Sequence, residues 1–165
     1  MYILLIDFLS VATRAYLAFI ALTVLLACDL GRSKKHQNFE RLNLLVRQYR
    51  NDVTLNELKA IFVVTEEGCP TCNKSLAQMV DKYLDDSTSL FWVSAMGSMV
   101  DISPFKLKPE RVVWDYDDSL RSSGIITGSG VILVSNGRVD TIVQLGNART
   151  VTGALAYVSD LLQMR

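Results

Sequence analysis

Two cysteines, Cys69 and Cys72, are the residues of this 165-residue chain whose types and spacing most clearly predict chemistry. They belong to the tetrapeptide Cys-Pro-Thr-Cys, shortly after an apolar run that ends at Thr65. Two thiols at this spacing can form a disulfide and open it again by thiol exchange. Because so short a loop hardly constrains the unfolded chain, the pair is better suited to exchange than to stabilising a fold.

The surroundings of the pair predict a difference between the two thiols. The motif lies where a buried strand is expected to turn into a helix, with Cys69 in the N-cap region, Pro70 at the first helical position and Cys72 in the first turn. Unpaired backbone N–H groups and the helix dipole favour a thiolate at a helix N-terminus. We therefore predict that Cys69 is the more exposed and more acidic thiol, with a buried Cys72 within reach to resolve a mixed disulfide.

Other interpretations of the pair remain open. Half of a zinc site needs two more ligands, and the soft or imidazole candidates left are Cys28 and His36. A purely structural disulfide suits an oxidising compartment. A binding module that merely retains the pair is a third interpretation. We predict no metal and no cofactor.

Hydrophobic patterning predicts the elements that position the pair. Helical spacing of apolar residues covers 39–50, the segment from Pro70 to about Tyr83, and a last stretch that begins at Thr150 or Thr152 and ends near Leu162. Short apolar runs predict strands, and Asn136-Gly137 predicts a type I′ hairpin. The expected strands are Ala60–Thr65, Ser89–Ala95, Arg111–Tyr116, Val131–Ser135 and Arg138–Leu145. This order predicts an α/β fold with a mixed sheet flanked by helices.

Residues 1–27 carry only two charges, and residues 15–27 form an uncharged apolar run that ends at Cys28. The run has the length of a signal-peptide core and is short for a membrane span. Its end, Leu-Leu-Ala-Cys, resembles the lipobox of bacterial lipoproteins, which implies lipidation of Cys28. An uncleaved anchor and a buried N-terminal helix are the alternatives. We expect a signal peptide or anchor over 1–27, a polar tether over 28–38 and a domain over 39–165.

The charge balance limits the partners of the chain. Lys and Arg number 17 and so do Asp and Glu, which gives a formal net charge of zero. Such a chain lacks the positive field that phosphate neutralisation needs, so we expect no nucleic-acid partner. A lipidated or anchored N-terminus places the domain outside the cytoplasm, at a membrane.

The stretch IFVVTEEGCPTCNKSL, the stretch SSGIITGSGVILVSNGRV and the closing helix together resemble the thioredoxin-like superfamily, and most closely its membrane-tethered TlpA-like thiol–disulfide oxidoreductases. The resemblance covers about residues 58–163. It implies a thioredoxin-like fold in which Cys69 attacks a client disulfide and Cys72 resolves the mixed disulfide. Its partners would be protein thiols and disulfides, together with an unidentified redox partner.

The chain departs from the pattern of this superfamily at several positions. Gly68 replaces the usual aromatic residue, and Val63 replaces the buried acid six residues before the first cysteine. Counting back from Asn136, the position of the cis-proline holds Ser129, between Gly128 and Gly130. We expect a trans Gly128–Ser129 bond, because a non-proline cis bond costs about 2.5–4 kcal/mol. We also expect residues 128–130 to form a flexible substrate-binding loop that faces the cysteines.

The sequence thus predicts an extracytoplasmic thiol–disulfide oxidoreductase that acts on protein disulfides. The alternative is a non-catalytic binding module of the same fold that retains a disulfide. A thiol peroxidase agrees less well, because Glu66 occupies the place of the threonine that peroxidases of this fold carry. A Ser-His-Asp hydrolase is disfavoured, because the only histidine, His36, lies in the expected tether.

Overall fold

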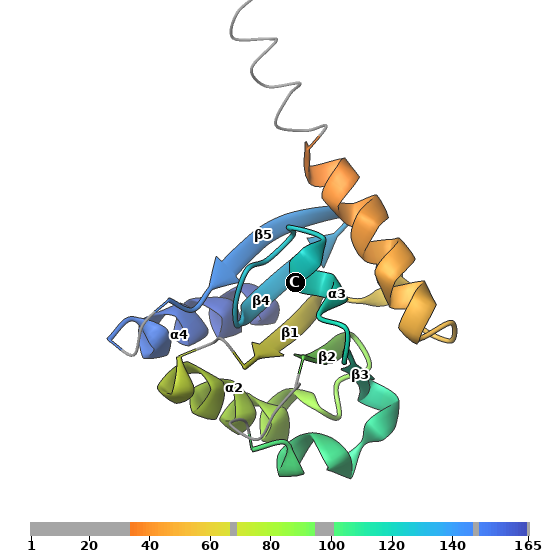
Figure 1. The fold of residues 1–165 in the computed structure, drawn as a ribbon. Coiled ribbons are helices and arrows are strands. Elements are labelled where there is room, and N and C mark those ends of the chain that lie inside the picture. Colours follow the sequence, from red (N-terminus) through yellow and green to blue (C-terminus); the bar gives the residue numbers. More distant parts are fainter. Residues whose placement is uncertain (1–33, 67–68, 95–100, 147–148, 165) are drawn as a thin grey trace, which may run out of the picture. The chain divides into compact units, whose positions relative to one another are not determined.

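The computed structural model describes residues 34–66, 69–94, 101–146 and 149–164 (Figure 1). The chain divides into two units, Met1–Lys35 and His36–Arg165. The expected leader over 1–27, Cys28 and the first part of the expected tether lie outside the described residues.

The described residues form both helices and strands. A helix over residues 34–49 comes first. The later helices are the 3₁₀ turns η1 (Leu55–Glu57), η2 (Ser103–Leu107) and η3 (Pro109–Arg111) and the α-helices α2 (Pro70–Tyr83), α3 (Ser119–Ser122) and α4 (Val151–Gln163). The strands are β1 (Ala60–Thr65), β2 (Ser89–Ser94), β3 (Val112–Trp114), β4 (Gly130–Ser135) and β5 (Arg138–Gln144).

The five strands form one mixed sheet in the order β3-β2-β1-β4-β5. Strand β1 pairs parallel with β2 and antiparallel with β4, which places it at the centre of the sheet. All six residues of β1 are buried, as a strand covered on both faces requires. The end of β1 therefore delivers Thr65, and the cysteine motif after it, from the middle of the sheet.

Alternate residues of the strands supply two hydrophobic clusters, one on each face of the sheet. The first cluster contains Phe62 and Phe91 together with Cys72 and Leu76 of α2 and Leu155 of α4. Helices α2 and α4 therefore cover the same face, as Figure 1 shows. Burial of side chains of this size stabilises the fold by roughly 1.5–3 kcal/mol each.

The second cluster lies on the opposite face. It contains Trp92 of β2 and Ile132 of β4, packed against Leu42 and Val46 of the helix over 34–49 and Leu120 of α3. Trp92 is fully buried, which agrees with the packing role that its place in an apolar run indicates. This helix supplies the cover that the second face of the sheet needs.

The hairpin between β4 and β5 confirms the turn predicted from Asn136-Gly137. Asn136 has φ 49° and Gly137 has φ 68°, so both central residues are left-handed as a type I′ turn requires. At the other end of β4, a Cβ on Gly130 would collide with the Val143 carbonyl oxygen of β5. Only glycine lets the two backbones approach so closely at that point.

The mixed α/β sheet flanked by helices confirms the predicted class of fold. Two boundaries differ clearly. The expected strand Arg111–Tyr116 is the shorter β3, Val112–Trp114. Residues 34–38 of the expected tether are already helical. Four of those five residues, 34–37, are exposed, and hydrophobic periodicity detects only a buried face. Within the described residues, no helix combines the length and the apolar character that crossing a membrane requires.

Candidate functional site

Cys69 and Cys72 form a disulfide at the start of α2, with their Cα atoms 5.1 Å apart. Cys72 has no exposed surface and belongs to the cluster beneath α2, whereas Cys69 is partly exposed. The predicted difference in exposure between the two cysteine residues is therefore confirmed. Of the two, Cys69 is the one that a thiol reagent or a client disulfide would meet first.

The local sequence explains the position of Cys69 at the helix N-terminus. Helix α2 begins at Pro70, whose fixed φ suits the first helical position and whose missing N–H leaves no unpaired donor there. The Cys69 carbonyl accepts the first helical hydrogen bond from the Asn73 N–H at 3.0 Å. The Cys72 N–H points to the Cys69 sulfur at 3.1 Å. A thiolate on Cys69 would meet the same donor and the positive end of the helix dipole.

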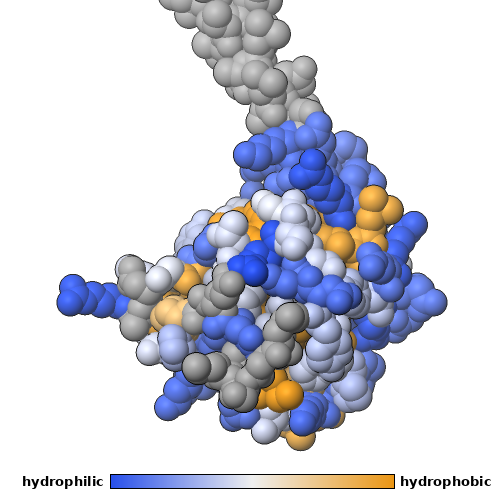
Figure 2. Space-filling model, viewed as in Figure 1, coloured by the Kyte–Doolittle hydropathy of each residue, from blue (hydrophilic) through white to orange (hydrophobic). Residues whose placement is uncertain are grey.

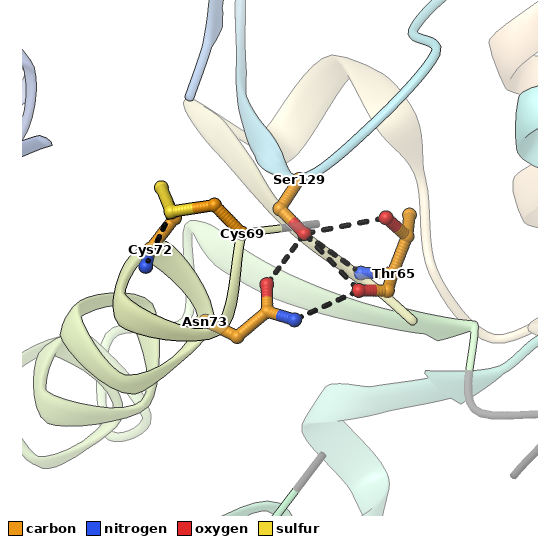
Figure 3. The surroundings of a disulfide bond; sticks show 5 residues. All are labelled: Thr65, Cys69, Cys72, Asn73 and Ser129. Atoms are coloured by element: carbon orange, nitrogen blue, oxygen red, sulfur yellow. Dashed lines mark hydrogen bonds between the residues drawn. A yellow bond between two sulfur atoms is a disulfide. The ribbon is translucent and has the colours of Figure 1, made fainter. Parts of the chain in front are cut away.

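A buried polar network adjoins the disulfide and joins three segments that are distant in sequence (Figure 3). The Ser129 hydroxyl donates to Asn73 Oδ1 at 2.6 Å and accepts from the Thr65 N–H at 2.9 Å. Asn73 Nδ2 donates to the Thr65 carbonyl oxygen at 2.8 Å. All three residues are buried, so each hydrogen bond lies in a region of low dielectric constant.

The donors and acceptors of this network match one another. Ser129 has a single hydroxyl hydrogen, and the short distance to Asn73 Oδ1 assigns it there rather than to the Thr65 carbonyl oxygen at 3.4 Å. The Thr65 hydroxyl, 3.3 Å from Ser129 Oγ, can then donate to it. Among the described residues, no buried side-chain nitrogen or oxygen lacks a hydrogen-bond partner.

The network also explains how β1 leaves the sheet. The pairing of β1 with β4 ends at Val63 opposite Gly130, two residues before the end of β1. The N–H of Thr65 therefore lacks a partner in β4, and the Ser129 side chain accepts its hydrogen bond instead. The Thr65 carbonyl is satisfied by the Asn73 side chain. The side chains of Ser129 and Asn73 thus replace the backbone pairing between β1 and β4 at the point where the chain turns toward Cys69.

The loop over 128–130 lies where the sequence places it, beside the first turn of α2. The described residues contain no cis peptide bond, so the Gly128–Ser129 bond is trans, as predicted. Within this loop, the Ser129 side chain has no exposed surface and is held in the network, so it is not itself available to contact a client. The Ser129 carbonyl is also engaged, by the Leu145 N–H at 2.8 Å.

A polar cavity of about 400 Å³ opens beside the carboxyl ends of β1 and β2. Ser94 donates to Asp118 at 2.9 Å, and Arg121 forms an ion pair with the same carboxylate. Neither Cys69 nor Cys72 lines the cavity. The described residues that line it are Thr65, Glu66, Ser94, Asp117, Asp118, Arg121 and Ser122. In the view of Figure 2, the described surface is mostly hydrophilic, with only scattered hydrophobic residues.

The buried carboxylate of Asp115 anchors the segment that borders this cavity. It accepts hydrogen bonds from Trp92 Nε1 at 2.8 Å, the Ser119 N–H at 2.9 Å, the Leu120 N–H at 3.0 Å and the Tyr49 hydroxyl at 3.0 Å. The carboxylate of Asp115 therefore caps α3, because it accepts the N–H groups of its first two residues. Asp118, with φ 55°, turns the chain so that Asp115 can reach them.

Two other sequence-based candidates lie away from the disulfide. Val63 packs on the opposite face of the sheet from Cys72, so even an acid at position 63 would point away from the buried thiol. His36 is exposed on the helix over 34–49, with Nε2 4.0 Å from Glu40. Among the described residues, no three His, Cys, Asp or Glu side chains are grouped so that they could hold a metal ion.

Comparison with known proteins does not identify a family. No protein-family model matches the chain, and no curated protein sequence shows significant similarity to it. The assignment of a function therefore rests on the geometry of the site and on the sequence pattern.

Proposed function

We propose that this chain is an extracytoplasmic, thioredoxin-like thiol–disulfide oxidoreductase that acts on protein disulfides. One observation carries the proposal: the Cys69–Cys72 disulfide lies at the N-terminus of α2, with Cys69 partly exposed and Cys72 buried. A disulfide that only stabilises a fold gains nothing from an exposed sulfur at a helix N-terminus. A nucleophile needs both the access and the electrostatic environment of that position.

The sheet supports the proposed kinship with thioredoxin-like proteins. Strands β1 and β2 with the intervening α2 form a βαβ unit, and β4, β5 and α4 form a ββα unit. The βαβ and ββα motifs meet at the antiparallel pairing of β1 with β4. The motif follows β1, and Ser129 directly precedes β4, as the resemblance in sequence requires.

The proposed reduction of a client disulfide has two exchange steps. The Cys69 thiolate attacks one client sulfur, forms a mixed disulfide and releases the other client sulfur as a thiolate. Cys72, once deprotonated, then attacks the Cys69 sulfur, releases the second client thiolate and closes the Cys69–Cys72 disulfide. Two electrons pass from the protein dithiol to the client, and a thiol donor must restore the dithiol. With an oxidising partner, the same steps run in reverse.

Insulin reduction tests this function. In the presence of dithiothreitol, the wild-type chain is expected to accelerate precipitation of the insulin B chain well beyond dithiothreitol alone. The matched control is the Cys69→Ser/Cys72→Ser double variant, which should match the rate of dithiothreitol alone. A wild-type chain that is no faster than this double variant would favour the alternative, a binding module that retains a disulfide.

The proposed location rests on the apolar run that ends at Cys28 and predicts lipidation of that residue. Detergent-phase partitioning of the protein expressed in a bacterial host tests this prediction. The wild-type chain is expected in the detergent phase with an acyl mass on residue 28, and Cys28→Ala without that mass. Wild-type protein that partitions into detergent without an acyl group would contradict lipidation and favour an uncleaved anchor.

A further inference from the structure

The hydrogen bonds around the disulfide fasten both ends of the segment that carries Cys69. Thr65 lies at the end of β1, before Cys69, and Asn73 lies in the first turn of α2, after Cys72. The bond from Asn73 Nδ2 to the Thr65 carbonyl joins two residues eight positions apart, with both cysteines between them. Ser129 then joins the two ends from a third segment, because its hydroxyl accepts from the Thr65 N–H and donates to Asn73 Oδ1.

We propose that Thr65, Asn73 and Ser129 form a clamp that positions the Cys69 sulfur at the N-terminus of α2. The three are positioning residues, because none of them forms a hydrogen bond with the sulfur atom of Cys69 or Cys72 in the structure. The inference rests on the proposed redox function and assigns to Ser129 a role different from contact with a client. Figure 3 shows the Asn73 and Ser129 side chains directed at each other beside the disulfide.

The clamp matters most once the disulfide is reduced. In the disulfide form, the S–S bond itself holds Cys69 against the first turn of α2. After reduction that bond is gone, and the first turn of a helix tends to fray because its N–H groups lack helical partners. The Asn73 side chain then remains as a tie from this turn to the central strand. With the turn intact, the Cys72 N–H can continue to point at the Cys69 sulfur, which stabilises the thiolate.

The sequence offers a reason for a clamp of this kind. Position 129 lacks the rigid proline of the resembled pattern, and glycines lie on both sides of it. A loop with two glycines has high conformational entropy when unfolded and needs fixed contacts to stay in one place. The buried Ser129 hydroxyl provides such contacts to the central strand and to α2.

The test is the acidity of the Cys69 thiol in Ser129→Ala, Asn73→Ala and the double variant. The full-length chain is purified in detergent and reduced with dithiothreitol, which gives two electrons and two protons to the disulfide and becomes a cyclic disulfide itself. After the reductant is removed, iodoacetamide labelling of each cysteine is followed by mass spectrometry over a range of pH. This site-specific readout separates Cys69 from Cys28 and Cys72.

Each single variant is expected to raise the pKa of Cys69. At a pH below the wild-type pKa, the labelling of Cys69 should then slow by about three- to tenfold, because less thiolate is present. Since Ser129 and Asn73 share one hydrogen bond, the double variant should shift the pKa by less than the sum of the two single shifts. Asn73→Leu, which is neutral, similar in size and unable to form either side-chain hydrogen bond, should shift the pKa in the same direction and covers the case in which Asn73→Ala does not fold.

Ser89→Ala is the matched control, because Ser89 is also a fully buried serine. It lies at the start of β2, away from the disulfide, and donates to Asp86. The Ser89→Ala variant should lower the stability without moving the pKa of Cys69. If Ser129→Ala and Asn73→Leu also lower the stability and leave this pKa at the wild-type value, the clamp is merely structural and the inference is wrong. If both variants shift the pKa although the wild-type chain fails to reduce insulin, the clamp stands and the proposed function fails.

Discussion

Replacing Cys69 with serine is expected to reduce disulfide-exchange activity at least about 100-fold, to the rate of dithiothreitol alone. A serine hydroxyl does not ionise near neutral pH, so the exposed position would no longer carry a nucleophile. The remaining thiol, Cys72, has no exposed surface and cannot replace it. The measurement is insulin reduction by equal amounts of wild-type and Cys69→Ser protein.

Replacing Cys72 with serine is expected to give a different phenotype with equally low turnover. Cys69 can still attack a client, but no second thiol remains to resolve the mixed disulfide. Non-reducing gels should therefore show covalent complexes for Cys72→Ser that disappear with dithiothreitol, and few for Cys69→Ser. Complexes that form with Cys69→Ser and not with Cys72→Ser would reverse the roles of the two cysteines and contradict the roles inferred from their exposure.

Most of the fold follows from local patterns in the sequence. The boundaries of β1 match the apolar run Ala60–Thr65, because a central strand buried on both faces leaves an uninterrupted apolar stretch. The positive φ angles of Asn136 and Gly137 follow from the residue types alone. Helix α2 begins at Pro70 for the same kind of reason. In each case the determining interactions lie within a few residues of the element.

The parts of the site that depend on distant contacts were not predictable in this way. Ser129 lies 56 residues from Asn73 and 64 from Thr65, so no local pattern indicates that the three meet. Asn73 itself resembles an ordinary polar residue of a helix, and only its burial beside a strand end gives it a role. A serine at the position of an expected proline, followed by a glycine that opens a strand, was the one signal that pointed to this loop.

The role of Asp115 also depends on residues distant in sequence and was not predictable from local patterns. Its replacement has the largest expected effect on stability. Its carboxylate accepts four hydrogen bonds, which come from the first helix, β2 and α3.

Replacement of Asp115 by alanine leaves buried donors such as the Trp92 indole N–H without an acceptor. Each such loss costs about 1–3 kcal/mol, and water can relieve part of it. We therefore expect Asp115→Ala to lower the free energy of unfolding by about 3–5 kcal/mol, measured by urea denaturation. Asp117→Ala, an exposed aspartate of the same loop, is the control and should change it little.

The pH dependence of stability gives an independent test of this carboxylate. Burial alone would raise the pKa of Asp115, but the N–H groups of Leu120 and Ser119, with the Trp92 and Tyr49 donors, outweigh burial and hold the pKa below its ordinary value. A group whose pKa is lower in the folded state contributes stability above its unfolded pKa, about 3.9 for aspartate. It loses this stability as the pH falls through the folded pKa.

The side chain of Asp115→Asn cannot ionise and lacks this contribution. The stability difference between wild type and Asp115→Asn should therefore be constant near neutral pH and shrink below about pH 4. The other aspartates with a lowered pKa, such as Asp86, are present in both proteins and cancel in this difference. A difference that stays the same down to the acid limit of folding would show that the hydrogen bonds of Asp115 do not depend on its charge.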